Sequence, residues 1–274
     1  MTAAFVELAA AEPASRFGGK ASHLAQAVRA GLPVPPGLVM DVEAVERLVA
    51  GDAPTRAQVE GLPERLGGAV AARSSAVGED GQGSSFAGQH ETVLNVLTGP
   101  ALVEAIRRVH ASGRSPGALS YRNQRGIAGE PQVAVLVQKL VDPESAGVLF
   151  TINPVTGADE LVVEAAWGLG EAVVAGTVTP DTYRLGRDGR VMERTAGDKD
   201  LAIVPQDGGG TREAPVASER AGSLCLDDGQ LAELHALASA CERAFGSRLD
   251  LEWAFAGGKL YLLQWRPVTT ARPH

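Results

Sequence analysis

The segment RLDLEWAFAGGKLYLLQWRP near the C-terminal end of the chain constrains the fold most. Apolar and polar residues alternate on both sides of a Gly-Gly pair, which is typical of a β-hairpin with one buried face. If Glu252 pairs with Gln264, the polar face carries Asp250, Glu252, Gln264 and Arg266. The opposite face then carries Leu251, Trp253, Phe255, Tyr261, Leu263 and Trp265. The pattern predicts a hairpin that buries its aromatic face.

The pairing of Glu252 with Gln264 depends on the turn. A two-residue Gly257-Gly258 turn would shift the register by one and mix the two sets, so we expect an odd-numbered loop around Ala256–Leu260 with a glycine bulge. Two carboxylates and an amide suit Mg²⁺, and a neighbouring arginine can bind a phosphate through two hydrogen bonds. A solvated face with a surface salt bridge has the same pattern, so the hairpin alone leaves both interpretations open.

The rest of the chain predicts an α+β protein whose first half is rich in helices and whose second half is rich in strands. We place a boundary near Val141, which divides the chain into lobes 1–140 and 141–274. The expected helices cover residues 20–30, a segment capped by Asp41, 55–66, 101–112 and 230–245. The expected strands cover 37–40, 69–73, 132–141, 146–151 and 160–166, with a further hairpin over 182–195.

Composition excludes several classes of function. The net charge of −8 argues against a broad nucleic-acid surface, which needs a basic excess. No apolar run approaches the roughly 20 residues that cross a bilayer, and the N-terminus lacks the pattern of a signal peptide. Cys225 and Cys241 match no metal or redox spacing, so we expect free thiols. These features predict a cytoplasmic protein that associates with neither nucleic acid nor membrane.

Two segments have the composition of anion-binding sites. Arg73 opens the stretch RSSAVGEDGQGSSFAGQHET, whose small residues leave backbone N–H groups able to surround phosphates. The segment FGGKAS places Lys20 at the start of a helix, where the helix dipole favours an anion. It is not a P-loop, because Ala14 stands where that motif needs glycine and Ala21 where it needs Ser or Thr. A surface loop and a solvated lysine are the competing interpretations.

In their order along the chain, the motifs resemble those of a known family. They are GGKASHL, ARSSA…EDGQGSSFAGQHET, VLVQKLV, AGVLFTINPVTG, GLGEAVV, PDTY, LDLEWAF and LQWRPVT. Together they resemble the ATP-grasp domain shared by phosphoenolpyruvate synthase, pyruvate phosphate dikinase and rifampin phosphotransferase, from about Phe17 to Thr269. The resemblance implies two ATP-grasp lobes with the nucleotide between them, and ATP and Mg²⁺ as cofactors.

The resemblance also implies roles for individual residues. Lys20 and Arg73 would hold ATP phosphates, and Gly88 and Thr92 would lie in the loop over them. Gln138 and the backbone at Leu140 and Val141 would bind adenine at the hinge. On the hairpin, Glu252 and Gln264 would be metal ligands, while Asp250 and Arg266 would join Lys20 and Arg73 in catalysis. Glu171, Asn153 and Thr156 fall in family motifs without an assigned role.

The family transfers the β-phosphoryl group of ATP to a histidine on a swivelling domain, releasing AMP and phosphate. This chain is shorter than the family pattern between Met40 and Arg73, and it stops soon after the Gln-x-Arg-Pro motif, without a histidine domain. The first hypothesis is therefore an ATP-binding subunit that phosphorylates a histidine on a separate partner chain. The second is a stand-alone ATP-grasp kinase or ligase that acts on a small molecule. A non-catalytic nucleotide-binding module is the third, and the metal set argues against it.

Overall fold

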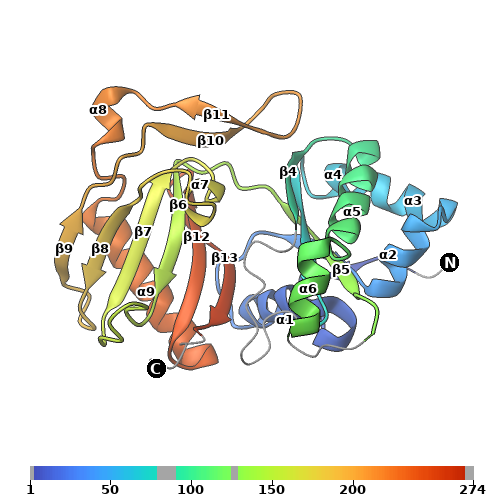
Figure 1. Cartoon of the computed structure of the whole chain (residues 1–274), viewed down its shortest axis with the longest axis horizontal. Coiled ribbons are helices and arrows are strands. Elements are labelled where there is room, and N and C mark those ends of the chain that lie inside the picture. Colours follow the sequence, from blue (N-terminus) through green and yellow to red (C-terminus); the bar gives the residue numbers. More distant parts are fainter. Residues whose placement is uncertain (1–2, 79–90, 125–128, 269–274) are drawn as a thin grey trace. The chain divides into compact units, whose positions relative to one another are not determined.

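Two large antiparallel β-sheets, one in each of two structural units, organise the computed structural model (Figure 1). The structure describes residues 3–78, 91–124 and 129–268. The first unit comprises Met1–Arg29, Pro35–Leu140 and Gln206–Gly210, and the second comprises Ala30–Val34, Val141–Pro205 and Thr211–His274. The main boundary between the units falls between Leu140 and Val141. Two short segments were not expected from the sequence: residues 30–34 belong to the second unit and residues 206–210 to the first.

The first unit has a five-stranded sheet with helices on both faces. Helix α1 (Ala14–Arg29) packs on one face, where the Ser75 hydroxyl binds its backbone. The buried core on the other face joins sheet residues such as Val70 and Val135 to residues of α2, α3 and α5. The strand order is β1 (Val6–Glu7), β2 (Gly37–Met40), β5 (Val133–Lys139), β3 (Val70–Ala76) and β4 (Thr92–Val96). The other helices are η1 (Leu8–Ala10), α2 (Val42–Val49), α3 (Ala53–Glu60), α4 (Leu62–Arg65), α5 (Gly99–Ser112) and α6 (Pro116–Gln124).

Local sequence explains where these helices begin and end. The Asp41 side chain accepts a hydrogen bond from the Ala44 N–H and caps α2, as expected. The helix expected over 55–66 is split into α3 and α4 at Gly61. Helix α1 begins before the predicted Lys20, and a kink at Gly18 (φ 76°) separates its first turn from the predicted part.

The second unit has a six-stranded antiparallel sheet with α9 (Asp228–Phe245) on one face (Figure 1). Phe245 of α9 stacks on Trp265 with ring centroids 4.1 Å apart. The strand order is β13 (Lys259–Pro267), β12 (Leu249–Ala256), β6 (Ser145–Phe150), β7 (Leu161–Trp167), β8 (Asp181–Leu185) and β9 (Val191–Thr195). The remaining elements are α7 (Glu171–Val174), α8 (Ser218–Ala221) and a two-stranded ribbon of β10 (Leu201–Pro205) and β11 (Thr211–Pro215), which the sequence analysis missed.

The C-terminal hairpin has the predicted pairing but not the predicted turn. Glu252 pairs with Gln264 and Asp250 with Arg266. The turn is nevertheless the two-residue Gly257-Gly258 turn, with both residues at positive φ, so the expected odd-numbered loop was wrong. A bulge restores the register, because Glu252 pairs with Gln264 while Trp253 pairs with Leu262.

The bulge also changes which residues of β13 lie on the buried face. Leu263 is the extra residue, and the fully buried Leu262 lies opposite Trp253 in its place. Tyr261 pairs with Ala254 and therefore shares the face of Glu252. The assignment of Tyr261 and Leu263 to the aromatic face was wrong. Leu251, Trp253, Phe255 and Trp265 are buried as predicted.

Candidate functional site

The polar face of the hairpin is the candidate site of the second unit. Asp250 and Gln264 are 8% and 7% exposed, and Glu252 and Arg266 are half-buried. The Arg266 guanidinium donates through Nε and Nη2 to Asp250 Oδ2, each at 2.7 Å. Residues in cross-strand pairs share a face, so the four side chains lie on the same side of the sheet.

Burial gives this face unusual electrostatics. Burial raises the pKa of the Asp250 carboxyl, the Arg266 guanidinium opposes that rise, and the charge of Glu252 adds to it. Asp250 and Glu252 therefore repel each other in surroundings that penalise negative charge. A cation placed beside them would relieve both the repulsion and the cost of burial.

Glu164 belongs to the same face, and sequence analysis missed it. Glu252 pairs with Val148 of β6, and Val148 pairs with Glu164 of β7, which puts the two glutamates on one side of the sheet. Burial and the charge of Asp250 raise the pKa of Glu164. The signal was present in LVVEAAW, where a single carboxylate interrupts an otherwise apolar strand.

These carboxylates do not form a complete metal cage. Within the described residues, no group of three or more His, Cys, Asp or Glu side chains could hold a metal ion. The donor set that remains is the Glu252 carboxylate and the Gln264 amide oxygen, which are paired residues. Such a set fits Mg²⁺ that takes its other ligands from substrate phosphates and water.

Arg73 and two neighbours form the candidate site of the first unit. Arg73 on β3 is 9% exposed, and Thr92 on β4 lies directly opposite it. The Arg73 Nη1 donates to Gln138 Oε1 at 3.1 Å, and Gln138 Nε2 donates to the Pro35 carbonyl at 3.1 Å. The three predicted residues Arg73, Thr92 and Gln138 therefore come together on adjacent strands of one sheet.

Lys20 follows the kink in α1. The Ser75 hydroxyl accepts a hydrogen bond from the Ala21 N–H at 2.9 Å and donates to the Phe17 carbonyl at 2.7 Å, which fastens this segment to β3. Only glycine fits at Gly18, because a Cβ there would lie 2.0 Å from the Ser75 carbonyl oxygen. Lys20 and Arg73 thus belong to two elements in direct contact.

The hinge assignments are only partly compatible with adenine binding. The Leu140 N–H already donates to the Ala69 carbonyl at 2.9 Å, so it is not available to a base. Val141 begins the main segment of the second unit. Gly88 lies outside the described residues.

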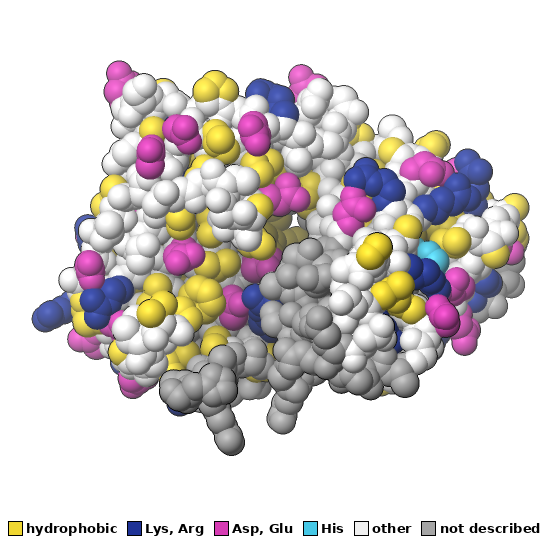
Figure 2. Space-filling view, viewed as in Figure 1, with side chains coloured by type: hydrophobic (Ala, Val, Ile, Leu, Met, Phe, Trp, Pro, Cys, Tyr) yellow, Lys and Arg dark blue, Asp and Glu magenta, His cyan; other side chains and the backbone are white. Residues whose placement is uncertain are grey.

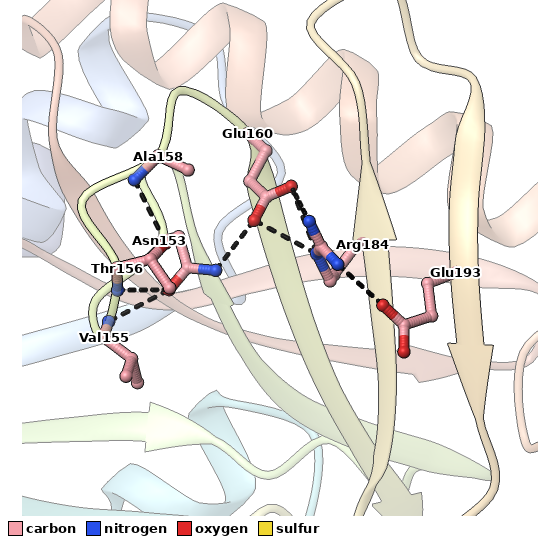
Figure 3. Close-up of polar contacts among 7 residues, drawn as sticks. All are labelled: Asn153, Val155, Thr156, Ala158, Glu160, Arg184 and Glu193. Carbon is pink, nitrogen blue, oxygen red and sulfur yellow. Dashed lines mark hydrogen bonds and ion pairs between the residues drawn. The ribbon is translucent and has the colours of Figure 1, made fainter.

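Asn153 and Thr156 lie in a loop whose shape is fixed by a polar network (Figure 3). The Asn153 Oδ1 accepts from the N–H groups of Val155 and Thr156, each at 3.0 Å, and its Nδ2 donates to Glu160 at 2.7 Å. Arg184 holds Glu160 through Nε and Nη2. The NPVTG motif is explained by the shape of this loop. Glu171 starts α7, and burial raises the pKa of its carboxyl.

Three further features concern the drawn surface, the helices and the cysteines. On the face drawn in Figure 2, acidic and basic side chains are interspersed rather than gathered into a basic surface. In the described ranges no helix is long and apolar enough to span a bilayer. Cys225 and Cys241 are free thiols, as predicted, and the structure shows that both are buried. Burial raises the pKa of both thiols, that of Cys241 to about 12, which makes them poor nucleophiles.

Comparison with known proteins relates the chain to ATP-binding domains and phosphotransferases. The family model described as "Pyruvate phosphate dikinase, AMP/ATP-binding domain" matches residues 53–274. A probable phosphoenolpyruvate synthase from Methanothermobacter thermautotrophicus is 34% identical over 97% of this chain and 46% of its own length. A rifampicin phosphotransferase from Streptomyces sviceus is 34% identical over 93% of this chain and 34% of its own length. D-alanyl-alanine synthetase A from Vibrio cholerae aligns with 92% of this chain and 56% of its own at 12% identity, with a TM-score of 0.41, which is too low to bear on the fold.

The chain thus spans less than half the length of these two curated relatives. The family match covers most of the chain, including Arg73, Gln138 and the whole C-terminal hairpin. Together with the mixed helix and strand architecture, it confirms the expected α+β fold class and ATP as the nucleotide. The chain belongs to the family of the pyruvate phosphate dikinase AMP/ATP-binding domain.

Proposed function

We propose that this chain binds ATP with Mg²⁺ and transfers a phosphoryl group to a histidine on a separate partner chain. The observation that carries the proposal is the pairing of Glu252 with Gln264 and of Asp250 with Arg266 on one half-buried face of a hairpin. Family membership and the phosphotransferase names of the relatives support it. The buried free thiols fit a cytoplasmic location, which we include in the proposal.

Each residue has a defined task in this proposal. Glu252 and Gln264 hold Mg²⁺, which when bound neutralises charge on the phosphate oxygens. Arg266 binds a phosphate oxygen, and Asp250 fixes the direction of its guanidinium. Lys20 and Arg73 of the first unit bind ATP phosphates and neutralise the charge that develops during transfer.

The identity of the nucleotide released from ATP tests the proposal. The purified chain is incubated with ATP and Mg²⁺, with and without the products of neighbouring genes, and the released nucleotide is identified. AMP and phosphate that form only with a partner, together with a phosphohistidine on that partner, are expected. ADP, or AMP with pyrophosphate, in the presence of a small molecule alone would instead support a stand-alone kinase or ligase. ATP binding without turnover under every condition would contradict both.

Substitutions connect the named residues to that reaction. Lys20→Ala, Arg73→Ala and Arg266→Ala should each lower the rate about 10²–10³-fold, as the loss of one positioned charge does. Lys259→Ala is the matched control, because Lys259 is an exposed lysine next to the hairpin turn. An equal loss in the control and in Lys20→Ala would show that overall charge, rather than a positioned contact, matters.

A further inference from the structure

We propose that Gln138 is a positioning residue that orients Arg73 toward phosphate, and that it does not bind the adenine base. This inference rests on the proposed function, in which Arg73 binds ATP phosphates. It differs from the role implied by the family resemblance, which placed Gln138 at the adenine. The difference follows from what the Gln138 amide contacts in the structure.

Both ends of the Gln138 amide are already occupied. The side chain is 3% exposed; its Oε1 accepts from Arg73 Nη1 and its Nε2 donates to the Pro35 carbonyl, each at 3.1 Å. A guanidinium can only donate and a carbonyl can only accept, so a single orientation of the amide satisfies both neighbours. At 3% exposure the amide presents almost no surface to a base, and turning the side chain outward toward adenine would break these buried hydrogen bonds.

The anchor for Gln138 is rigid. The Pro35 carbonyl lies just before β2, in which Gly37 pairs directly with Gln138. The Lys139 N–H donates to the Pro36 carbonyl at 2.9 Å, which also fixes the residue directly after Pro35. Gln138 also pairs with Ala71, so Arg73 is its diagonal neighbour on the same face of β3. The amide therefore holds the guanidinium at a fixed position relative to the backbone of the sheet.

A neutral acceptor suits this task better than a charged one. A carboxylate at residue 138 would hold Arg73 more strongly, but it would cancel the charge that an anion needs. It would also place an acceptor oxygen against the Pro35 carbonyl, where the amide now donates. An amide orients the arginine without adding a negative charge beside it.

Binding of ligand fragments separates positioning from base recognition. Calorimetry compares ATP, adenosine and inorganic tripolyphosphate, with Mg²⁺, on the wild type, Gln138→Met and Gln138→Glu. Gln138→Met keeps the volume and removes both hydrogen bonds. It should weaken ATP and tripolyphosphate by the same factor, about 10- to 100-fold for one lost charge-assisted hydrogen bond, and leave adenosine unchanged. Gln132→Ala, an exposed glutamine next to the same strand, is the control.

A double mutant tests whether Gln138 acts through Arg73. Arg73→Ala combined with Gln138→Met should bind tripolyphosphate no more weakly than Arg73→Ala alone. Gln138→Glu, which keeps an acceptor for Arg73, should also weaken tripolyphosphate, and it replaces Gln138→Met in the comparison if that variant does not fold.

Three results would overturn the inference, and they can be told apart. Weaker adenosine binding with unchanged tripolyphosphate binding would assign Gln138 to the base. Unchanged tripolyphosphate binding in both Gln138 variants, with a loss in Arg73→Ala, would contradict positioning while leaving the proposed function intact. Equal tripolyphosphate binding by the wild type and Arg73→Ala would contradict the phosphate role of Arg73 and hence the proposed function at that residue.

Discussion

The two units present candidate site faces of opposite charge, and they hold their charged side chains in different ways. In the first unit, Arg73 is held by the neutral amide of Gln138, and the Lys20 segment is fastened by the Ser75 hydroxyl. In the second unit, Asp250 and Glu252 repel each other on a half-buried face, where Arg266 is the partner of Asp250. Neutral contacts orient a cation without adding a negative charge beside it. The carboxylates of the second unit instead carry a cost of burial and mutual repulsion, which a bound cation would lower.

The contacts of each unit suit a different kind of ligand group. Phosphate oxygens suit the basic face of the first unit, which carries Lys20 and Arg73, and a divalent cation suits the acidic face of the second unit, which carries Glu164, Asp250 and Glu252. Burial of Arg73 and Asp250 argues against the solvated loop and the surface salt bridge that the sequence alone left open. The predictions below test whether the two faces behave as differently as their contacts indicate.

The largest expected effect is on the acidic face. Glu252→Ala should abolish Mg²⁺-dependent turnover and leave the fold intact, because the half-buried Glu252 side chain lies on the polar face rather than in the core. Turnover and the melting temperature are measured on the same preparation. Glu233→Ala on the exposed side of α9 is the control for the loss of one carboxylate. A collapse of the melting temperature would mean that Glu252 is a structural residue.

The opposite face of the same hairpin should respond in the reverse way. Trp253 is fully buried, and Trp253→Ala should lower the free energy of unfolding by about 3–5 kcal/mol, as truncation of a buried aromatic does. Urea unfolding gives this value. Tyr261→Ala is the matched control, because Tyr261 is half-buried on the Glu252 face and should cost less. Equal losses would contradict the register set by the bulge.

The basic face depends on backbone shape, and Gly18 tests it. A Cβ at Gly18 would lie 2.0 Å from the Ser75 carbonyl oxygen, at a φ of 76°. Gly18→Ala should therefore destabilise the protein by about 2–5 kcal/mol, the sum of a left-handed residue and an overpacked contact. Gly31→Ala is the control, since Gly31 has a φ of 75° but no atom within 4 Å of its Cβ. Equal losses of unfolding free energy in urea would show that strain alone, without the clash, explains Gly18.

The sequence predicted the elements of both units better than the details that complete the site. Alternation correctly predicted that Asp250 and Arg266 share a face, because successive side chains of a strand alternate between only two faces. The bulge at Leu263 could not be predicted, since an extra residue in a strand leaves no mark in an apolar run. The β10–β11 ribbon was missed because TREAP has no apolar alternation and only hydrogen bonds to β10 define it as a strand.

The site residues also divide into those that the sequence predicted and those that it did not. Lys20 and Arg73 stood out because each charge lies in a glycine-rich or hydroxyl-rich context. Glu164 interrupts an apolar strand, but its relation to Asp250 arises only when β12, β6 and β7 pair. The contact between Gln138 and Arg73 also depends on strand pairing, since the two residues are 65 positions apart. Patterns within one element were predictable, and relations across strands were not.

The smallest expected effect concerns Glu164 and depends on pH. Burial raises the pKa of this carboxyl in the folded protein above its value in the unfolded chain, which is about 4.3. The folded state therefore favours the protonated form, so the stability that this group contributes is complete below the unfolded pKa and is lost as pH rises through the folded pKa. Because glutamine does not ionise, Glu164→Gln should raise the melting temperature of the metal-free protein at pH 7.

The gain from Glu164→Gln should shrink as pH falls toward about 4, where the wild-type carboxyl is protonated in both states. Melting temperatures of the wild type and the variant between pH 4 and pH 8 measure the difference. Glu233→Gln on the exposed side of α9 controls for the loss of one surface charge. Mg²⁺ with ATP should reduce the gain at pH 7, because a cation on this face favours the ionised carboxylate. A melting-temperature difference between the two proteins that is constant across pH would show that ionised Glu164 does not destabilise the folded state. The contrast between the acidic and the basic face would then be smaller than proposed.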